Sequence, residues 1–499
     1  MTVGDAVPVR RAGNIALAVL GTAIVLVLLT GLLGPSAAQA KLPGGPGWLP
    51  PYALGLNPSP LLVTVLLMLA MLLSMAGLGW GMRCVARGWR PPVGRLTWAG
   101  AVATLAMIAV PPMGSTDVLF YAVYGRLTAL GADPYRDTAQ LLIDRGDPIG
   151  LATQGLRWTD TTSVYGPVAT ATQWLASVIG GSSVHATVFV LTAMCAAAYL
   201  ITGMLLRRMV AGDPARQVRV ALLWTINPVL LFVGVNSGHV DTLGVVFAVA
   251  ALYAGGRRWW PVAGVLLGLA CAVKLTFGLF VLAMVLVLFR KPRRLLIVLA
   301  GGAVVGVVGY LLVGLDAVSS TLQAGGRYSS AGPLRLLLYP LAAWLGADLG
   351  LRVIVILSWL LLVIIAVLLY RRLTATAPPG GDFVARAGLA AAALTVAWVL
   401  TAAYSLPWYD IAAWAPVALL ITAGPAERLM SIRTPLLVCA YLPGAAVALP
   451  PDAQLLTDVV RNGIAPAVGM LLLIAVFWFC RPGVRQRADR AQPRSAANR

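Results

Sequence analysis

The sequence predicts an all-α polytopic membrane protein, and three observations lead to that fold class. Hydrophobic residues make up 60% of the 499 residues and charged residues only 11%, against roughly 25% in soluble domains. The apolar residues gather in runs that approach the roughly 20 residues needed by a membrane-spanning helix. The basic residues form short clusters between these runs, as is typical of the cytoplasmic loops of membrane proteins.

The apolar runs predict about 12–14 transmembrane helices. We expect one domain over residues 1–481 and a basic tail, 482–499. Spans are expected near 14–34, 60–82, 97–113, 184–206, 218–234, 240–255, 259–273, 275–289, 295–314, 351–370, 387–403, 411–425, 434–450 and 463–480. The Ala-Gln-Ala at 38–40 resembles a signal-peptide cleavage site, but the apolar stretch before it is too long for one. We therefore expect an uncleaved anchor.

The charge distribution predicts the orientation. The net charge of +20 comes from 37 Lys and Arg against 17 Asp and Glu, and it lies in loops rather than on a basic face that could bind nucleic acid. With the N-terminus inside, most basic residues fall on the cytoplasmic side and most acids outside. The Arg-, Ala-, Gly- and Val-rich composition fits a bacterium. We expect the bacterial cell (inner) membrane, cytoplasmic N- and C-termini and no cytoplasmic nucleotide site, because no phosphate-binding Gly-rich motif is present.

Two long outer loops, 114–183 and 315–350, are expected to form the active-site face. Within the first, the segments 118–130 and 164–180 are moderately apolar but too short or too polar to span a membrane. They predict helices that lie in the membrane interface or against the bundle.

Asp117 follows an apolar span by four residues, so its carboxylate is expected at the outer mouth of the bundle. On a helix that starts there, Tyr121 and Tyr124 share its face. This combination suits a sugar hydroxyl, since the carboxylate can take a proton while the rings pack on the sugar. The alternative is that Ser115, Thr116 or Asp117 only caps the helix, and the pattern by itself favours the cap slightly.

His239 and Asp241 flank a tight turn between two spans, and both are candidates to face one cavity. The alternative is a polar helix-turn-helix cap with a solvated His, which the pattern by itself favours slightly, and too few ligands are visible for a metal. Lys274 is expected near membrane depth, close to the outer face, where a cation is costly and indicates a functional site. It is a candidate to bind a lipid phosphate, or it extends to the surface. Arg327 and Arg335 are further phosphate candidates.

Trp408 and Tyr409 open another outer loop. Aromatic residues often mark the membrane interface, and they also line sugar or prenyl grooves. The polar residues gather on the outer side only. This distribution favours an enzyme over the competing class, a transporter or flippase, which needs ionisable groups near the middle of the membrane.

Several short motifs occur together in a fixed order. They are Asp117 with Tyr121 and Gly125, Asp133-Pro134-Tyr135, Tyr165-Gly166-Pro167, Asn227-Pro228, the 236–241 turn, Val273-Lys274 and Pro407-Trp408-Tyr409. With these motifs, residues 115–410 resemble the GT-C glycosyltransferases. The chain is more closely similar to the actinobacterial polyprenol-phosphomannose-dependent alpha-1,6-mannosyltransferases.

The resemblance implies a GT-C-type bundle that transfers mannose, with inversion, from polyprenyl-phosphate mannose to a lipid-linked mannan or glycolipid acceptor. The linkages that it implies are alpha-1,6. Asp117 would be the base, and Lys274, Arg327 and Arg335 would bind the donor phosphate. The expected sugar- and acceptor-binding residues are Tyr121, Tyr124, Arg126, Asp133, Tyr135, Tyr165, His239, Asp241, Trp408 and Tyr409. Many GT-C enzymes carry two adjacent acids where this chain has only Asp117, so neither a metal nor another cofactor is expected. An arabinosyl- or glucosyltransferase is the nearest alternative.

Overall fold

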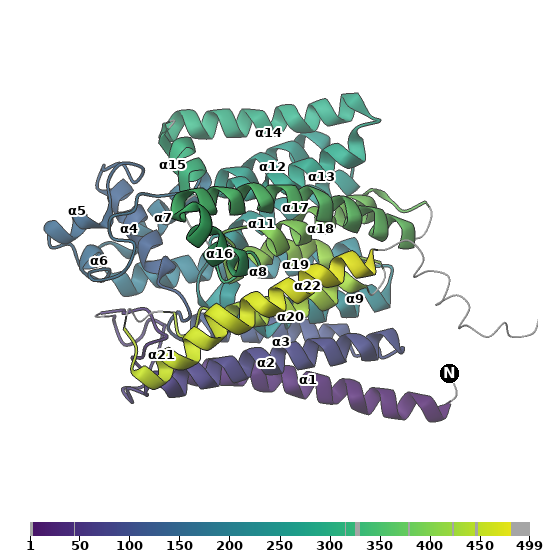
Figure 1. Cartoon of the computed structure of the whole chain (residues 1–499), viewed down its shortest axis with the longest axis horizontal. Coiled ribbons are helices and arrows are strands. Elements are labelled where there is room, and N and C mark those ends of the chain that lie inside the picture. The colour runs from purple at the N-terminus through teal and green to yellow at the C-terminus, as the bar shows by residue number, and fades with distance from the viewer. Residues whose placement is uncertain are drawn as a thin grey trace, which may run out of the picture.

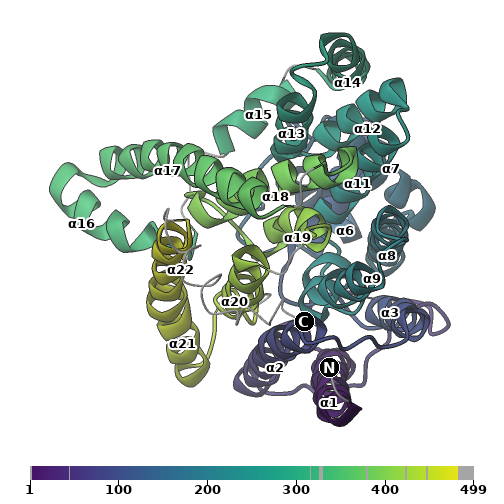
Figure 2. The ribbon, with the colours of Figure 1, turned by 90° about the vertical axis from the view of Figure 1, so that its right-hand side faces the viewer.

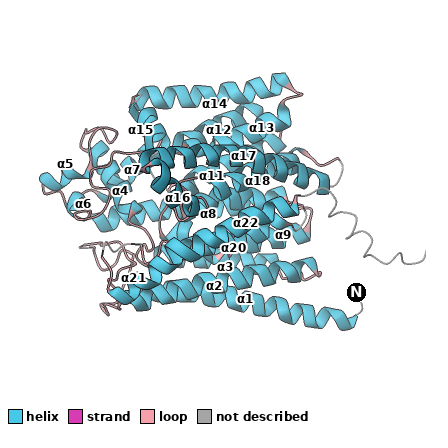
Figure 3. Ribbon diagram, viewed as in Figure 1, coloured by secondary structure: helices cyan, strands magenta, loops and turns pink. Residues whose placement is uncertain are grey.

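The computed structural model describes residues 3–43, 45–314, 316–324, 330–377, 380–421, 424–444 and 448–480. Over these residues the chain forms helices and loops and has no named strand (Figure 3). One isolated antiparallel bridge joins Gln39 and Met113. The predicted all-α fold is confirmed. The basic tail expected at 482–499 and the phosphate candidate Arg327 lie outside the described residues.

Three successive sets list the elements in chain order, and most of the α-helices are labelled in Figure 1. The labels η1, η2 and η5 denote π-helices, and η3 and η4 denote 3-10 helices. The first set is α1 (Val3–Leu32), α2 (Pro60–Ala86), α3 (Val93–Ile108), α4 (Asp117–Ala129), α5 (Ala139–Asp144), α6 (Pro148–Leu151), α7 (Pro167–Gly180) and α8 (Val184–Met209). The second is α9 (Pro214–Val220), η1 (Ala221–Thr225), α10 (Pro228–Leu230), η2 (Leu231–Asn236), α11 (Asp241–Gly256), α12 (Trp260–Val273), η3 (Leu275–Phe277), α13 (Gly278–Leu288) and α14 (Pro292–Val313). The third is α15 (Asp316–Ala324), α16 (Arg335–Leu345), α17 (Ala347–Thr376), α18 (Phe383–Thr401), η4 (Pro407–Asp410), α19 (Ile411–Ala418), α20 (Pro425–Cys439), α21 (Pro451–Asp458), η5 (Val459–Ile464) and α22 (Ala465–Phe479).

Eight helical segments of the described chain are long and apolar enough to cross a membrane. They are Pro8–Leu32, Pro60–Ala86, Val184–Met209, Pro214–Asn236, Pro292–Val313, Ala347–Thr376, Phe383–Thr401 and Pro451–Phe479. Five shorter apolar helices accompany them: Val93–Ile108, Asp241–Gly256, Trp260–Val273, Leu275–Leu288 and Arg335–Leu345. The chain is a multi-pass membrane protein, and fewer of its helices are full-length spans than the sequence suggested.

The spans expected at 411–425 and 434–450 are wrong. The helices in this region are α19, which has eight residues, and α20, which begins at Pro425 and ends at Cys439. They carry buried ion pairs, Arg433 with Asp410 and Glu427 with Arg219 of α9. Because protein surrounds these short helices, they do not need the length or the uniform apolarity of a lipid-facing span.

The predicted outer loop 315–350 is more helical than expected, because it contains α15, α16 and the start of α17. The span expected at 463–480 begins earlier than predicted, as part of one continuous helical segment, Pro451–Phe479. Seen along the bundle, α16 and α17 form one arm and α21 and α22 another (Figure 2). Side chains from both arms line the cleft described below.

The long helices lie side by side, with the N-terminus at one end and α4, α5, α6 and α21 at the other (Figure 1). The helices expected at 118–130 and 164–180 are confirmed as α4 and α7. Residues 118–125 of α4 are buried, because α4 packs between α7 and α8. This buried helix fixes the position of its first residue, Asp117.

Candidate active site

Asp117 is the first residue of α4 and follows the loop that connects α3 to α4. Thr116 occupies the N-cap position but makes no side-chain capping hydrogen bond. Ser115 accepts a hydrogen bond from the backbone N–H of Asp117, at 3.1 Å from Oγ to N. Ser115 therefore serves the start of the helix, and the carboxylate of Asp117 lines a cleft instead.

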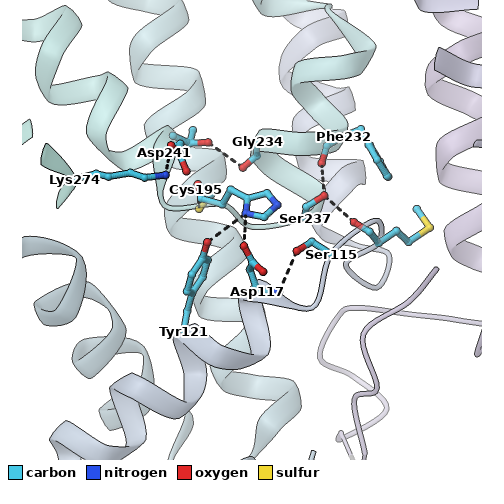
Figure 4. Close-up of polar contacts among 12 residues, drawn as sticks. Ser115, Asp117, Tyr121, Cys195, Phe232, Gly234, Ser237, Asp241 and Lys274 are labelled. Carbon is cyan, nitrogen blue, oxygen red and sulfur yellow. Dashed lines mark hydrogen bonds and ion pairs between the residues drawn. The ribbon is translucent and has the colours of Figure 1, made fainter. Parts of the chain in front are cut away.

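Hydrogen bonds connect the 236–241 turn to the segment that precedes α4. The side chain of Asn236 donates to the carbonyl of Met107 at 3.0 Å and accepts from the N–H of Met113 at 3.1 Å. Ser237 donates to the carbonyl of Met113 at 2.7 Å (Figure 4). Gly238 has a φ of +69°, which a residue with a side chain rarely adopts. These contacts bring the turn against the acid, although about 120 residues separate the two in sequence.

His239 lies next to Asp117 and is fully buried. Its Nδ1 is 3.2 Å from the hydroxyl of Tyr121 and 3.8 Å from Oδ2 of Asp117. Its ring stacks on Trp408, with 3.8 Å between centroids and 11° between planes. Burial, helped by the positive charge of Lys274, holds the pKa of His239 well below its usual range. The imidazole is therefore neutral, and its edge faces the acid.

Lys274 lies between α12 and η3, and its charge is matched. Its ammonium contacts Asp241 (Figure 4), at 2.9 Å from Oδ1. The ammonium also lies 3.6 Å from the centroid of the Tyr409 ring. The Asp241 side chain is 2% exposed and that of Lys274 is 11% exposed. The ion pair is therefore nearly buried. Lys274 lines the cleft, and Asp241 lies behind it.

The environment of Asp117 suits a proton acceptor. Burial raises the pKa of Asp117 to about 6, against the opposing effects of the Ser115 hydroxyl and the charge of Lys274. Its side chain nevertheless keeps 19% of its surface exposed. A carboxyl with a pKa near neutrality is a stronger base than an ordinary one and is still ionised at pH 7.

The cleft has a volume of about 1230 Å³ and reaches from Asp117 to α16, α17 and η5. The predicted site residues that line it are Asp117, Tyr124, Tyr165, Lys274, Arg335, Trp408 and Tyr409. Directly behind this surface, Tyr121 packs edge-on against Tyr165, at 5.1 Å between centroids, and contacts His239. Most of the predicted site therefore comes together in one place.

Three predicted residues lie elsewhere. Arg126 is ion-paired with Asp147 at 2.8 Å. Asp133 accepts from the N–H of Tyr135 at 2.9 Å, as expected for a turn residue. The Tyr135 hydroxyl is 2.7 Å from that of Thr170. These contacts stabilise the segment between α3 and α8, and none of the three side chains lines the cleft.

Several cleft residues were not singled out from the sequence. Arg461 and Asn462 of η5, Tyr441 and Arg157 all line the cleft. Arg461 carried a usable signal, because a charged residue inside a segment apolar enough to cross a membrane indicates function. The other three have no distinguishing pattern.

The described part of the chain brings no group of three or more His, Cys, Asp or Glu side chains together for a metal ion. The expectation that the reaction needs neither metal nor cofactor remains a prediction. The chemistry available from the residues that line the cleft is that of two carboxylates, Asp117 and Asp458, several cations and several aromatic side chains.

Comparison with known proteins identifies the family. No curated protein matches the chain. A family model described as "alpha-(1->6)-mannopyranosyltransferase, N-terminal domain" matches residues 18–290, more than half of the chain. The matched region contains Asp117, His239, Asp241 and Lys274, whereas Arg335 and Arg461 follow it. The chain belongs to the alpha-(1->6)-mannopyranosyltransferase family.

Proposed function

We propose that this mannosyltransferase takes mannose from a polyprenyl-phosphate-mannose donor and adds it, with inversion, to a lipid-linked mannan acceptor through alpha-1,6 linkages. The observation that carries the proposal is the position of Asp117. Its carboxylate lines the cleft beside aromatic side chains and cations. The helix that begins with Asp117, α4, lies at the end of the bundle opposite the N-terminus (Figure 1).

In the proposed reaction, Asp117 accepts the proton of the acceptor hydroxyl while that oxygen forms the new bond to C1 of mannose. The bond between C1 and the phosphate oxygen breaks, and its electron pair leaves with polyprenyl phosphate. Attack from the face opposite the leaving group converts a beta-linked donor into an alpha-linked product. Cations of the cleft stabilise the phosphate that departs.

His239 acts in this proposal as a positioning residue. Its neutral ring is held between Trp408 and Tyr121, and its Nδ1 faces the carboxylate at 3.8 Å. Such a ring restricts the orientation of Asp117 without neutralising its charge. Tyr165 and Tyr409 provide aromatic surface for the sugar rings.

A lipid-borne donor is supported by the apolar part of the cleft. Leu338 of α16 and Leu351, Val355, Trp359 and Leu362 of α17 line it together with Asp117. An isoprenoid chain could lie against these side chains while its phosphate and sugar reach the polar end. A nucleotide sugar has no matching apolar part.

The direct test supplies membranes containing the chain with radiolabelled polyprenyl-phosphate mannose and analyses the products. We expect labelled mannan with new alpha-1,6 linkages, and no comparable transfer from polyprenyl-phosphate arabinose or glucose or from a nucleotide sugar. Transfer only from the nucleotide sugar would refute the lipid donor. Preferred transfer of arabinose or glucose would show that the enzyme is an arabinosyl- or glucosyltransferase instead.

We further propose that the cleft faces the outside of the bacterial cell membrane and that both termini are cytoplasmic. The exposed Gln140 of α5 lies at the end with the cleft, whereas the exposed Ala211 follows α8 at the other end. In a background without the five native cysteines, Gln140→Cys should react with an impermeant thiol reagent on intact cells. Ala211→Cys should react only after lysis, and the reverse pattern would contradict this orientation.

A further inference from the structure

A second group of positive charges lines the cleft where α16 meets η5. Arg335 donates through Nη2 to the hydroxyl of Tyr339 at 2.9 Å and to the side-chain oxygen of Asn462 at 2.8 Å. Arg461 lies over the ring of Tyr441, with its guanidinium carbon 4.9 Å from the centroid. All these partners are neutral, so they orient the two guanidinium groups without matching their charge.

Two other cations in or near the cleft have an acid as partner, whereas Arg157 lies over the ring of Trp158 and has no ion pair among the described residues. Lys274 is paired with Asp241 and Arg433 with Asp410. Within the described residues, neither Arg335 nor Arg461 has a carboxylate oxygen within 4.0 Å. The Nε of Arg335 is buried and has no hydrogen-bond partner there.

An acid also lines this part of the cleft, but it is engaged by amides. Asp458 accepts from the side-chain nitrogen of Gln454 at 2.8 Å and lies 3.5 Å from that of Asn462. Two cations against one acid leave this region positive. Arg461 belongs to a helical segment apolar enough to cross a membrane, where an unmatched cation is costly. A bound anion would remove that cost.

The surroundings narrow the class of anion. The apolar side chains of α16 and α17 line the same cleft, so the ligand carries hydrocarbon as well as negative charge. Guanidinium groups bind phosphate oxygens through paired hydrogen bonds. A lipid whose polar end is a phosphate meets both requirements.

We propose that Arg335 and Arg461 form a binding site for a lipid phosphate, separate from the Lys274–Asp241 pair. This inference rests on the proposed function, in which donor and acceptor are both carried on lipids. The phosphate comes either from the polyprenyl donor or from the lipid anchor of the acceptor, and the recognition chemistry is the same for both.

The test measures binding of unglycosylated polyprenyl phosphate to the purified full-length chain in detergent, with polyprenol of equal length as the uncharged control. The variants are Arg335→Gln/Arg461→Gln and the matched control Arg352→Gln, an exposed arginine of α17 that does not line the cleft. We expect at least about tenfold weaker polyprenyl phosphate binding in the double variant, from the loss of charged hydrogen bonds. Polyprenol binding and the Arg352→Gln variant should match the wild type.

A parallel measurement identifies the source of the phosphate. If the double variant binds polyprenyl phosphate normally but shows at least about a tenfold rise in KM for the acceptor, the site holds the acceptor's lipid phosphate. Unchanged polyprenyl phosphate binding together with unchanged KM for both substrates would overturn the proposal.

Two further variants keep the result clear if the double glutamine variant folds poorly. Arg335→Lys/Arg461→Lys retains the charge and should bind with intermediate affinity. Asp458→Asn removes the neighbouring acid and should tighten binding about twofold to threefold. A failure of both variants to alter binding or KM would again overturn the site.

The outcomes also separate this site from the proposed function. Arg-dependent binding of polyprenyl phosphate without any mannose transfer by the wild type would refute the function and leave the site standing. Normal mannose transfer with no dependence on either arginine would support the proposed function and refute the phosphate site.

Discussion

Near Asp117 the ammonium of Lys274 is paired with Asp241, whereas Arg335 and Arg461, further along the same cleft, have neutral partners. The first region lies within the family-matched residues 18–290 and the second lies beyond them. Matched, buried charges hold a reactive group in a fixed geometry. Unmatched charges leave electrostatic attraction available for a ligand. We infer a division between a region for chemistry and a region for binding.

The largest effect should come from the acid itself. Asp117→Asn keeps the size of the side chain but cannot accept a proton, so we expect kcat to fall by about 10²–10⁴-fold. Donor binding and thermal unfolding should remain near wild type, because Ser115 serves the helix start. Steady-state kinetics with Asp133→Asn as control measures this. Ordinary turnover by Asp117→Asn would place the base elsewhere.

Breaking the buried ion pair of Lys274 and Asp241 should lower the stability of the fold. Lys274→Ala leaves Asp241 buried without its partner, and we expect the free energy of unfolding to drop by about 3–5 kcal/mol. Thermal unfolding in detergent would report this loss, and Lys274→Met/Asp241→Asn should recover most of it. An unchanged melting temperature for Lys274→Ala would show that Lys274 extends to the surface and supports nothing.

The pH dependence tests the electrostatics of the reactive region. The pKa of Asp117 is raised to about 6, and only the ionised carboxylate can take a proton. Activity should therefore be constant above this pH and fall as the pH drops through 6, by about tenfold at pH 5. The kcat/KM profile would show this limb, and it should be absent from the residual activity of Asp117→Asn. A wild-type limb near pH 4 would indicate an ordinary solvated acid.

The smallest expected effect concerns His239. Asn can place an N–H near the position of Nδ1, the atom that faces Asp117, whereas Gln reaches the position of Nε2. We expect His239→Gln to lower kcat about fivefold, the value of the one hydrogen bond that Nδ1 makes with the Tyr121 hydroxyl, and His239→Asn to lower it less. A rapid-mixing assay at saturating substrate compares the two. Equal losses in both variants would reduce His239 to a packing role.

Local patterns in the sequence predicted much of the reactive region. The spacing of apolar residues gave α4 and α7 their positions, and the end of an apolar run located Asp117 at the mouth of the bundle. Composition predicted the all-α membrane fold because the bilayer imposes a length and a polarity on each lipid-facing helix.

Other features depend on contacts that sequence spacing does not contain. Lys274 and Asp241 are 33 residues apart, and His239 meets Asp117 only through the packing of α4 against the turn. Hydropathy also failed for α19 and α20, because protein surrounds them and each contains a proline. For helices of this kind the bilayer sets neither length nor polarity.

The most direct test of the division is one kinetic comparison. Asp117→Asn and Arg335→Gln/Arg461→Gln would be measured in the same assay, with donor and acceptor each varied to saturation. We predict that the Asp117 variant lowers kcat and leaves both KM values near wild type. The arginine variant should raise one lipid substrate's KM far more than it lowers kcat. A raised KM without loss of kcat in Asp117→Asn, or a loss confined to kcat in the arginine variant, would contradict the account.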